Sequence, residues 1–218
     1  MKLDKNSRGT LGIVYSLSVA VIALLVIFAG DHPWVCMPLI VLILWFCVWQ
    51  TAFFRVPDRN PAGSDKKVSA VADGRICIIQ KAYEGEYLRR ECLQVCIYMN
   101  FFDVHANFWP VDGEVTYYKY HPGAHALAFK PKASEENEHT CTCVRTADGR
   151  EVFFKQIAGG FARRIVNYAE PGLQVKAGDQ CGIIKFGSRI DYFLPLECDL
   201  MVEVGDLMRA CETIICTI

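Results

Sequence analysis

The chain has 218 residues, which is enough for one or two domains, and its formal net charge is −1. Hydrophobic residues make up 52% of the sequence and the mean hydropathy is +0.20, both high for a water-soluble protein of which 22% is charged. The near-zero charge points to no particular class of partner, and we expect no nucleic acid among the partners.

The excess of apolar residues lies at the N-terminus. Residues 11–30 and 33–54 contain no Asp, Glu, Lys or Arg, and only Asp31 and His32 separate the two runs. Each run is about as long as a helix that crosses a bilayer. Two buried core helices would be an alternative. A signal peptide fits poorly, because a second apolar run follows at once without a small-residue cleavage site. We therefore predict a membrane hairpin over residues 1–54.

Lysine and arginine flank this hairpin on both sides and are absent from its connecting loop. The flanking cations are Lys2, Lys5, Arg8, Arg55, Arg59, Lys66 and Lys67. Because basic flanks stay on the cytoplasmic side of a membrane, both ends of the hairpin are expected there. This places the long C-terminal part on the cytoplasmic face of the cell (inner) membrane. The cations on the C-terminal flank could also attract anionic lipid headgroups, although control of topology alone would explain them equally well.

The eleven cysteines are scattered and odd in number, which favours a reducing compartment over a disulfide framework. Cys141-x-Cys143 and Cys92-x3-Cys96 do not have the spacing of a zinc site, and no pair of histidines follows them. We interpret these cysteines as small apolar residues of a core, and we expect no metal.

Residues 55–67 are rich in Pro, Gly and charge and are predicted to be a linker, followed by a cytoplasmic domain over 68–218. Short alternating runs between turn signals make this domain mostly β. Residues 159–168 could be a short helix or a strand. The predicted strands are 68–71, 75–82, 88–99, 114–120, 124–129, 139–146, 151–157, 182–186, 189–193, 199–204 and 213–217.

Two segments of this domain are similar to each other. Residues 173–187 and 200–216 share a Val-x-x-Gly-Asp pattern followed by a strand. The pattern resembles the turns of barrel-sandwich hybrid folds, to which lipoyl and biotinyl carriers belong, so a compact β domain of that character is expected. A membrane-tethered carrier or adaptor without enzymatic activity is therefore an alternative. A carrier needs a lysine at a hairpin tip, and Lys185 lies two residues before the expected tip.

The segment "CGIIKFGSRIDYFLP", residues 181–195, is typical of a β-hairpin with its turn at 187–189. A glycine followed by a solvated serine is an ordinary turn, so these residues alone do not indicate chemistry. The chain also offers three Asp-Gly turns and five histidines. Residue types alone permit a Ser–His–Asp constellation but do not select its members. No nucleotide-binding glycine loop or Walker motif occurs in the sequence.

Several longer motifs resemble the phosphatidylserine decarboxylase family in its short form, over residues 53–218. In the order of that family they are "FFRVPDR", "VADGRI", "MNFFDVHANFWPVDG", "YHPGAHALAFKPKASEENE", "FKQIAGGFARRIV" and "GIIKFGSRIDYFLP". The resemblance implies an enzyme that cleaves its own Gly-Ser bond, converts the serine into a pyruvoyl cofactor and decarboxylates phosphatidylserine to phosphatidylethanolamine and CO2. It also implies a large and a small chain that remain together as a heterodimer, while a homo-oligomer is left open.

Carried over to this chain, the resemblance implies that Ser188 is the self-cleavage nucleophile and pyruvoyl precursor, and that Gly187 supplies the carbonyl it attacks. His105 corresponds to the general base and Asp73 to the carboxylate that orients it. Long forms of the family carry a second histidine three residues after the first, where this chain has Phe108. A related pyruvoyl enzyme that acts on another headgroup is a further alternative.

Overall fold

The computed structural model describes residues 2–124, 136–159, 164–185 and 188–218. The chain divides into two compact units, Met1–Asp58 and Arg59–Ile218. The boundary between the units falls inside the segment predicted to be a linker, residues 55–67.

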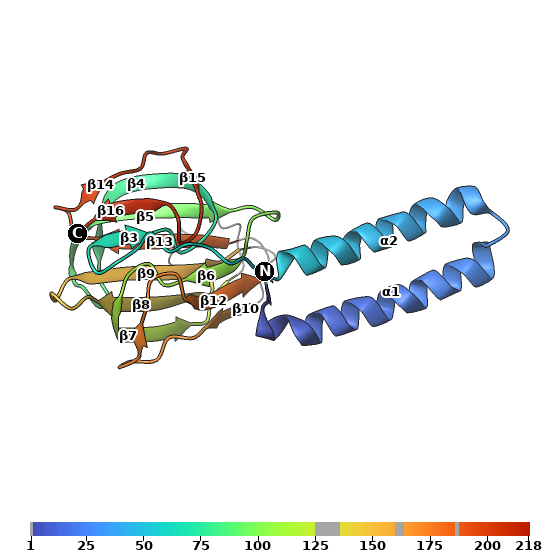
Figure 1. Ribbon diagram of the computed structural model, residues 1–218, viewed down its shortest axis with the longest axis horizontal. Helices are drawn as coiled ribbons and strands as arrows, with labels where there is room; N and C mark the ends of the chain where they lie inside the picture. Colours follow the sequence, from blue (N-terminus) through green and yellow to red (C-terminus); the bar gives the residue numbers. More distant parts are fainter. Residues whose placement is uncertain (1, 125–135, 160–163, 186–187) are drawn as a thin grey trace. The chain divides into compact units, whose positions relative to one another are not determined.

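The first unit is a pair of apolar helices, α1 (Arg8–Ala29) and α2 (Pro33–Phe53) (Figure 1). α1 follows a short 3-10 helix, η1 (Lys5–Ser7), and α2 begins on a proline, which suits the first position of a helix. The strands β1 (Lys2–Leu3) and β2 (Arg55–Val56) pair antiparallel and join the two ends of the unit. Both helices are long and apolar enough to cross a membrane, and nearly all of their residues are unburied. These properties favour membrane association.

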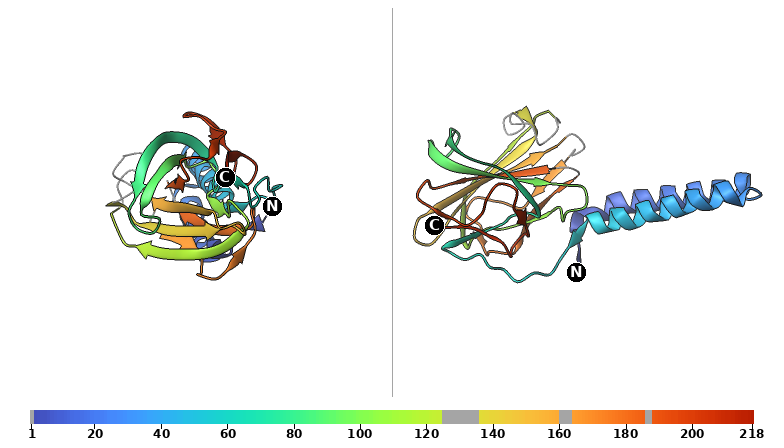
Figure 2. Two further views of the ribbon diagram at one scale, coloured as in Figure 1. Left: turned by 90° about the vertical axis from the view of Figure 1, so that its left-hand side faces the viewer. Right: turned by 90° about the horizontal axis from the view of Figure 1, so that it is seen from above.

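The second unit is built on one eight-stranded antiparallel sheet that curls on itself (Figures 1 and 2). Its strand order is β11-β7-β8-β9-β13-β5-β4-β15. The bounds are β4 (Gly74–Glu84), β5 (Arg90–Met99), β7 (Gly113–His121), β8 (His139–Arg145), β9 (Glu151–Ala158), β11 (Gln174–Val175), β13 (Ser188–Leu194) and β15 (Leu207–Met208).

Two three-stranded sheets complete this unit. One has the order β10-β12-β6 and the other β14-β16-β3. The bounds are β3 (Lys67–Ser69), β6 (Ala106–Phe108), β10 (Arg164–Asn167), β12 (Gln180–Lys185), β14 (Asp199–Leu200) and β16 (Ile214–Thr217). The domain is mostly β, as the sequence predicts, and the structure shows that its large sheet curls into a half-barrel.

The predicted hairpin at residues 181–195 is wrong. Its first arm, β12, pairs with β10 and β6, whereas its second arm, β13, pairs with β5 and β9 in the other sheet. Ser188 and Arg189, predicted to lie in a turn, are the first two residues of β13. The chain therefore passes from one sheet to another between Lys185 and Ser188, and residues 186–187 lie outside the described residues. Two neighbouring apolar runs predict two strands but not that they pair with each other.

Other strand predictions differ in detail. β6 was not predicted, because it has only three residues. Of the ambiguous segment 159–168, residues 164–167 form β10, while 160–163 lie outside the described residues. The predicted strand 124–129 also falls almost wholly outside them. The two Gly-Asp segments do form similar turns, since Asp179 N–H donates to Lys176 O and Asp206 N–H donates to Glu203 O, with Gly178 and Gly205 at positive φ.

β13 is buried along its whole length, and its side chains alternate between two apolar clusters. Ile190, Tyr192 and Leu194 belong to the main core, while Phe193 packs into a smaller cluster on the other face. That other face also carries a buried ion pair, in which Arg189 Nε donates to Asp191 Oδ1 at 2.6 Å and its Nη2 donates to Oδ2 at 2.7 Å.

We expect Asp191→Ala to lower the free energy of unfolding by about 3–5 kcal/mol, because it leaves the buried Arg189 guanidinium without its carboxylate. The measurement is urea unfolding of the detergent-solubilised chain. Arg145→Ala is the control, because it breaks an exposed pair with Glu151 and should change stability far less. Equal losses in the two variants would contradict a structural role for the buried pair.

Candidate functional site

Ser188 begins the central strand β13, with Met99 of β5 on one side and Ala158 of β9 on the other. The residue is fully buried, and its Oγ has no hydrogen-bond partner among the described residues. A buried hydroxyl without a partner costs about 1–3 kcal/mol, so such groups in a folded protein call for an explanation. Gly187, the predicted cleavage partner, lies outside the described residues.

His105 lies in the loop between β5 and β6 and is fully buried. Its Nδ1 is 3.0 Å from the carbonyl oxygen of Asp103. Because a carbonyl can only accept, Nδ1 carries the proton and Nε2 has the lone pair, which is the tautomer that a general base needs. The His105 carbonyl accepts from the N–H of Ile184 at 3.3 Å. His105 is therefore held against β12, the strand that leads to the predicted cleavage site.

Asp73 lies directly before β4, and its carboxylate is bound by Arg59. The Arg59 guanidinium donates from Nη1 to Oδ1 and from Nη2 to Oδ2, the latter at 2.8 Å. The backbone N–H of Ala210 also donates to Oδ1 at 2.8 Å. The hydrogen bond with Asp73 raises the pKa of Arg59. Among the described residues these two are the hydrogen-bond partners of Asp73, and His105 is not one of them. The role of Asp73 in orienting His105 therefore stays a prediction.

The position after Asp73 has no room for a side chain. Gly74 has a φ of +153°, and a Cβ there would lie 2.3 Å from the carbonyl oxygen of Tyr98 on β5. Only glycine lets β4 start so close to its neighbour. The Asp-Gly pair is therefore required by the backbone where it enters the sheet, and Asp73 is fixed at the strand end.

The backbone brings the three predicted residues to one region of the domain. Arg189 of β13 is opposite Tyr98 of β5, which is opposite Arg75 of β4. Ser188 and Asp73 therefore flank the same end of β5. The N–H of Phe108 on β6 donates to the carbonyl of Val71 at 2.9 Å, which ties the segment after His105 to the segment before Asp73.

Arg59 is a site residue that the sequence analysis interpreted differently. Grouped with the cations on the membrane flank, it was expected either to control topology or to attract lipid headgroups. Its side chain is instead only 6% exposed and is paired with Asp73. Its place in the "FFRVPDR" motif was the available signal, since membrane topology alone does not require a particular arginine at the end of that motif.

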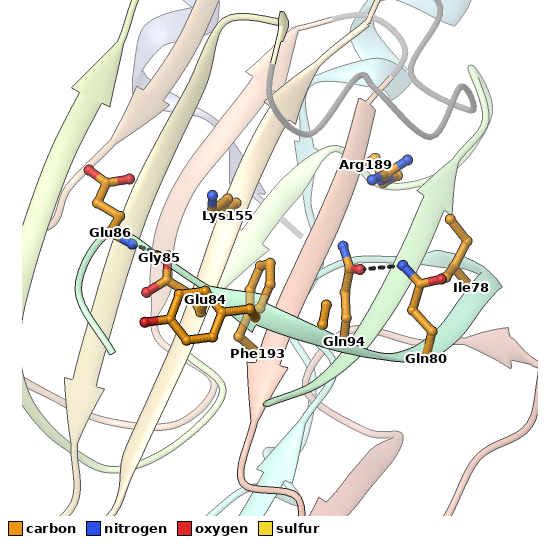
Figure 3. Close-up of a pocket in the computed structure, with 11 residues that line it drawn as sticks. Ile78, Gln80, Glu84, Gly85, Glu86, Gln94, Lys155, Arg189 and Phe193 are labelled. Atoms are coloured by element: carbon orange, nitrogen blue, oxygen red, sulfur yellow. Dashed lines mark hydrogen bonds between the residues drawn. The ribbon is translucent and has the colours of Figure 1, made fainter. Parts of the chain in front are cut away.

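The largest described cavities include one of 640 Å³ that Arg189, Lys155, Gln94 and Phe193 help to line (Figure 3). Successive residues of a strand point to opposite faces, so this cavity lies on the face of β13 that Ser188 does not face. Gln94 links the two sides of the cavity wall, because its Nε2 donates to Asp191 at 3.0 Å and its Oε1 accepts from Gln80 at 2.8 Å. The cavity is thus a neighbour of the Ser188 region rather than part of it.

Comparison with known proteins gives one consistent family. The model of the phosphatidylserine decarboxylase family matches residues 46–216. A phosphatidylserine decarboxylase proenzyme of Amoebophilus asiaticus is 44% identical over 171 residues, which cover 78% of this chain and 76% of the relative. Proenzymes of the same name from Syntrophus aciditrophicus and Porphyromonas gingivalis are 38% and 37% identical, over 93% and 99% of this chain and 93% and 98% of the relatives.

The match spans both the helical pair and the β domain, and the length of 218 residues fits the short form of the family. The chain belongs to the phosphatidylserine decarboxylase family.

Proposed function

We propose that this enzyme decarboxylates phosphatidylserine to phosphatidylethanolamine and CO2 after cutting its own chain between Gly187 and Ser188. The observation that carries the proposal is the buried Ser188 hydroxyl at the first position of a central strand, in a chain whose relatives are named proenzymes. A non-enzymatic carrier is not favoured, because membership of a decarboxylase family makes the chain an enzyme.

Self-cleavage begins when Ser188 Oγ attacks the carbonyl carbon of Gly187. A serine hydroxyl is a weak nucleophile until a base takes its proton. His105 is the proposed base, supported by its Nδ1–H bond to a carbonyl, which leaves Nε2 able to accept a proton. Because both reacting groups belong to one chain, the attack is intramolecular and gains effective concentration.

Cleavage would give a large chain, Met1–Gly187, and a small chain that starts at residue 188. β13 of the small chain pairs with β5 and β9 of the large chain, and β15 and β16 pair with β4 and β3. These pairings involve no strand that is cut. The two chains would therefore stay together as a heterodimer, and the new N-terminus would stay fixed at the sheet.

The proposed cofactor is a pyruvoyl group formed from Ser188, which would supply an electron sink for loss of CO2 from the amino acid headgroup. Ser188 fits this role because its hydroxyl is buried and has no hydrogen bond to another described residue that would have to break first. His105 would move protons in this second reaction as well.

The substrate is a two-tailed lipid, and the apolar helices α1 and α2 would keep the enzyme at the bilayer that contains it. The basic residues on both flanks and their absence from the connecting loop support a cytoplasmic position for the β domain. A different amino acid headgroup is the second candidate substrate, and lipid mass spectrometry of products from mixed phospholipids would discriminate the two.

Ser188→Ala should remove both self-cleavage and CO2 release, because the variant has no nucleophile and no pyruvoyl precursor. Intact mass of the purified chain should show the uncut 24.6 kDa species, while the unchanged protein gives two chains. Ser69→Ala is the matched control, since it removes another buried hydroxyl that only donates to Pro110 O. Normal decarboxylation by Ser188→Ala would refute the assignment.

His105→Gln should slow self-cleavage by about 10²–10⁴-fold, the usual contribution of a positioned general base. The rate is followed by gel electrophoresis of freshly synthesised chain. His32→Gln, in the exposed turn between the helices, should mature at the normal rate. Rapid cleavage in His105→Gln would remove this residue as the base.

Asp73→Asn and Arg59→Gln distinguish two possible roles of the Asp73 carboxylate, which are to support His105 and to hold the segment before β4 in place. If Asp73 supports His105, Asp73→Asn should slow cleavage strongly, while Arg59→Gln, which keeps the carboxylate, should slow it much less. Thermal unfolding of both variants shows how much of each effect is lost stability. Equal slowing in the two variants would mean that the Arg59–Asp73 pair acts only by holding the segment before β4 in place.

A further inference from the structure

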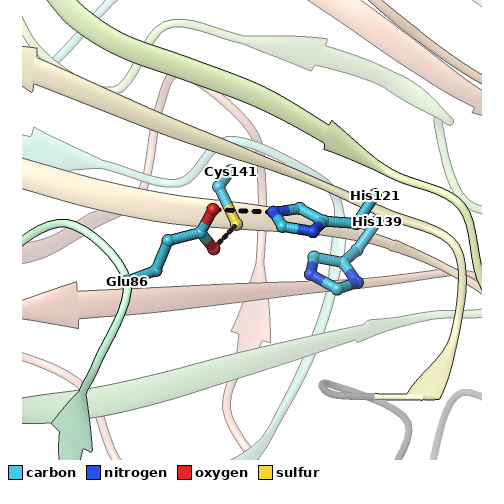
Figure 4. Close-up of side chains that lie close together, drawn as sticks. All are labelled: Glu86, His121, His139 and Cys141. Atoms are coloured by element: carbon cyan, nitrogen blue, oxygen red, sulfur yellow. Dashed lines mark hydrogen bonds and ion pairs between the residues drawn. The ribbon is translucent and has the colours of Figure 1, made fainter.

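Four side chains with metal-binding atoms meet on the face of the large sheet opposite the main core. Glu86 comes from the turn between β4 and β5, His121 is the last residue of β7, and His139 and Cys141 belong to β8 (Figure 4). One ligand atom from each lies within 4.8 Å of the others. His121 and His139 are cross-strand partners, and their rings stack with centroids 4.5 Å apart.

The Glu86 carboxylate accepts hydrogen bonds from two other members of this cluster. His121 Nε2 is 2.7 Å from its Oε1, and Cys141 Sγ donates to its Oε2 at 3.1 Å. Tyr117 also donates to Oε1 at 2.7 Å. A divalent cation could take the place of the His121 and Cys141 protons, because the imidazole nitrogen, the sulfur and the carboxylate would then all face it with lone pairs.

The separations suit a small tetrahedral ion. Zinc bonds of about 2.0–2.3 Å to nitrogen, oxygen and sulfur place ligand atoms about 3.3–3.8 Å apart. The two hydrogen-bonded pairs would have to open by about 1 Å or less to reach these distances. A thiolate, two imidazoles and a carboxylate are a donor set that suits zinc better than the oxygen-preferring magnesium or calcium.

The surroundings favour ligation on balance. His139 Nδ1 is 2.7 Å from the carbonyl oxygen of Asn137, which leaves Nε2 as the lone-pair atom, the usual arrangement behind a metal-binding histidine. The ammonium group of Lys119 would repel a bound cation, because its Nζ lies 3.4 Å from Glu86 Oε1. The Lys119 side chain is 55% exposed, however, so it can move into solvent.

We propose that Glu86, His121, His139 and Cys141 bind one zinc ion that fastens the β4–β5 turn to β7 and β8. In the sheet, β9 and β13 lie between β8 and β5, so this metal would join two parts of the curled sheet that are not neighbours in the strand order. Binding releases the Cys141 proton to solvent, while His121 would coordinate as a neutral imidazole through Nε2 with its ring proton on Nδ1. The site revises the interpretation of Cys141 as an apolar filler. The spacing of its ligands in the sequence matches no zinc motif, because the sheet assembles them.

The metal would also fix one wall of the 640 Å³ cavity, because Glu86 is one of the proposed ligands and also lines that cavity. Tyr87, the next residue, stacks on Tyr117 of β7 with ring centroids 4.6 Å apart. The turn is thus already directed toward β7, and the ion would hold it there more firmly.

The test uses the full chain in detergent, stripped with a chelator and titrated with Zn²⁺ or Co²⁺. We expect one equivalent to bind, a sulfur-to-cobalt charge-transfer band, and a higher thermal unfolding midpoint with zinc. Cys141→Ser should lose the band and bind zinc more than about 100-fold more weakly, since a direct ligand should matter more than the partners behind ligands, whose loss costs 10–100-fold.

Cys143→Ser is the matched control, because Cys143 is buried on the same strand, lies in the same apolar cluster and is outside the ligand group. It should keep the band, the stoichiometry and the zinc-dependent midpoint. Glu86→Gln, in the turn between β4 and β5, provides a second variant should Cys141→Ser fail to fold, and it too should bind zinc more weakly. No stoichiometric binding, or a cobalt band that persists in Cys141→Ser, would overturn the proposal. These readouts do not involve decarboxylation, so either outcome leaves the proposed function as it stands.

Discussion

The antiparallel pairing of β13 with β5 on one side and β9 on the other is the constraint on which the rest of the domain depends. Ser188 lies on a strand that pairs with a neighbour on each side. Its backbone position is therefore more restricted than it would be in a loop. The same pairing would keep the small chain in place after cleavage. Tyr192 adds to it, because its hydroxyl donates to the carbonyl oxygen of Ser69, which precedes the proposed cut, at 3.0 Å.

The alternation of side chains along β13 separates two chemical environments within two residues. Ser188 faces the side of the main core, while Arg189 and Asp191 form a buried ion pair on the other side. Although burial alone would lower the pKa of Arg189, its hydrogen bonds and charge interaction with Asp191 raise it. The charge of Arg189, which follows the proposed nucleophile Ser188 directly in sequence, is thereby kept on the opposite face of the sheet.

Much of the fold was predictable, because apolar run length and alternation depend on local sequence. The two membrane-length helices and most long strands follow from them directly. Strand partners do not, since a run such as 182–186 looks the same whether it pairs with its neighbour or with β6 and β10. The Arg59–Asp73 pair and the cluster around Glu86 were not predictable either, because their members are distant in the sequence and meet only in the folded domain. Ser188, Gly187, His105 and Asp73 were reached through family motifs rather than local chemistry.

Because β12 and β13 do not pair with each other, the cut proposed between Gly187 and Ser188 has a different structural consequence from a cut in a hairpin. In a hairpin, a cut at the turn would separate two strands that hold each other. Here β12 pairs with β10 and β6, all of which precede the proposed cut, and β13 pairs with β5 and β9. A cut between Lys185 and Ser188 therefore breaks no strand pairing on either side. The cut proposed at Gly187-Ser188 falls in this interval, so both chains would keep all of their described strand pairings.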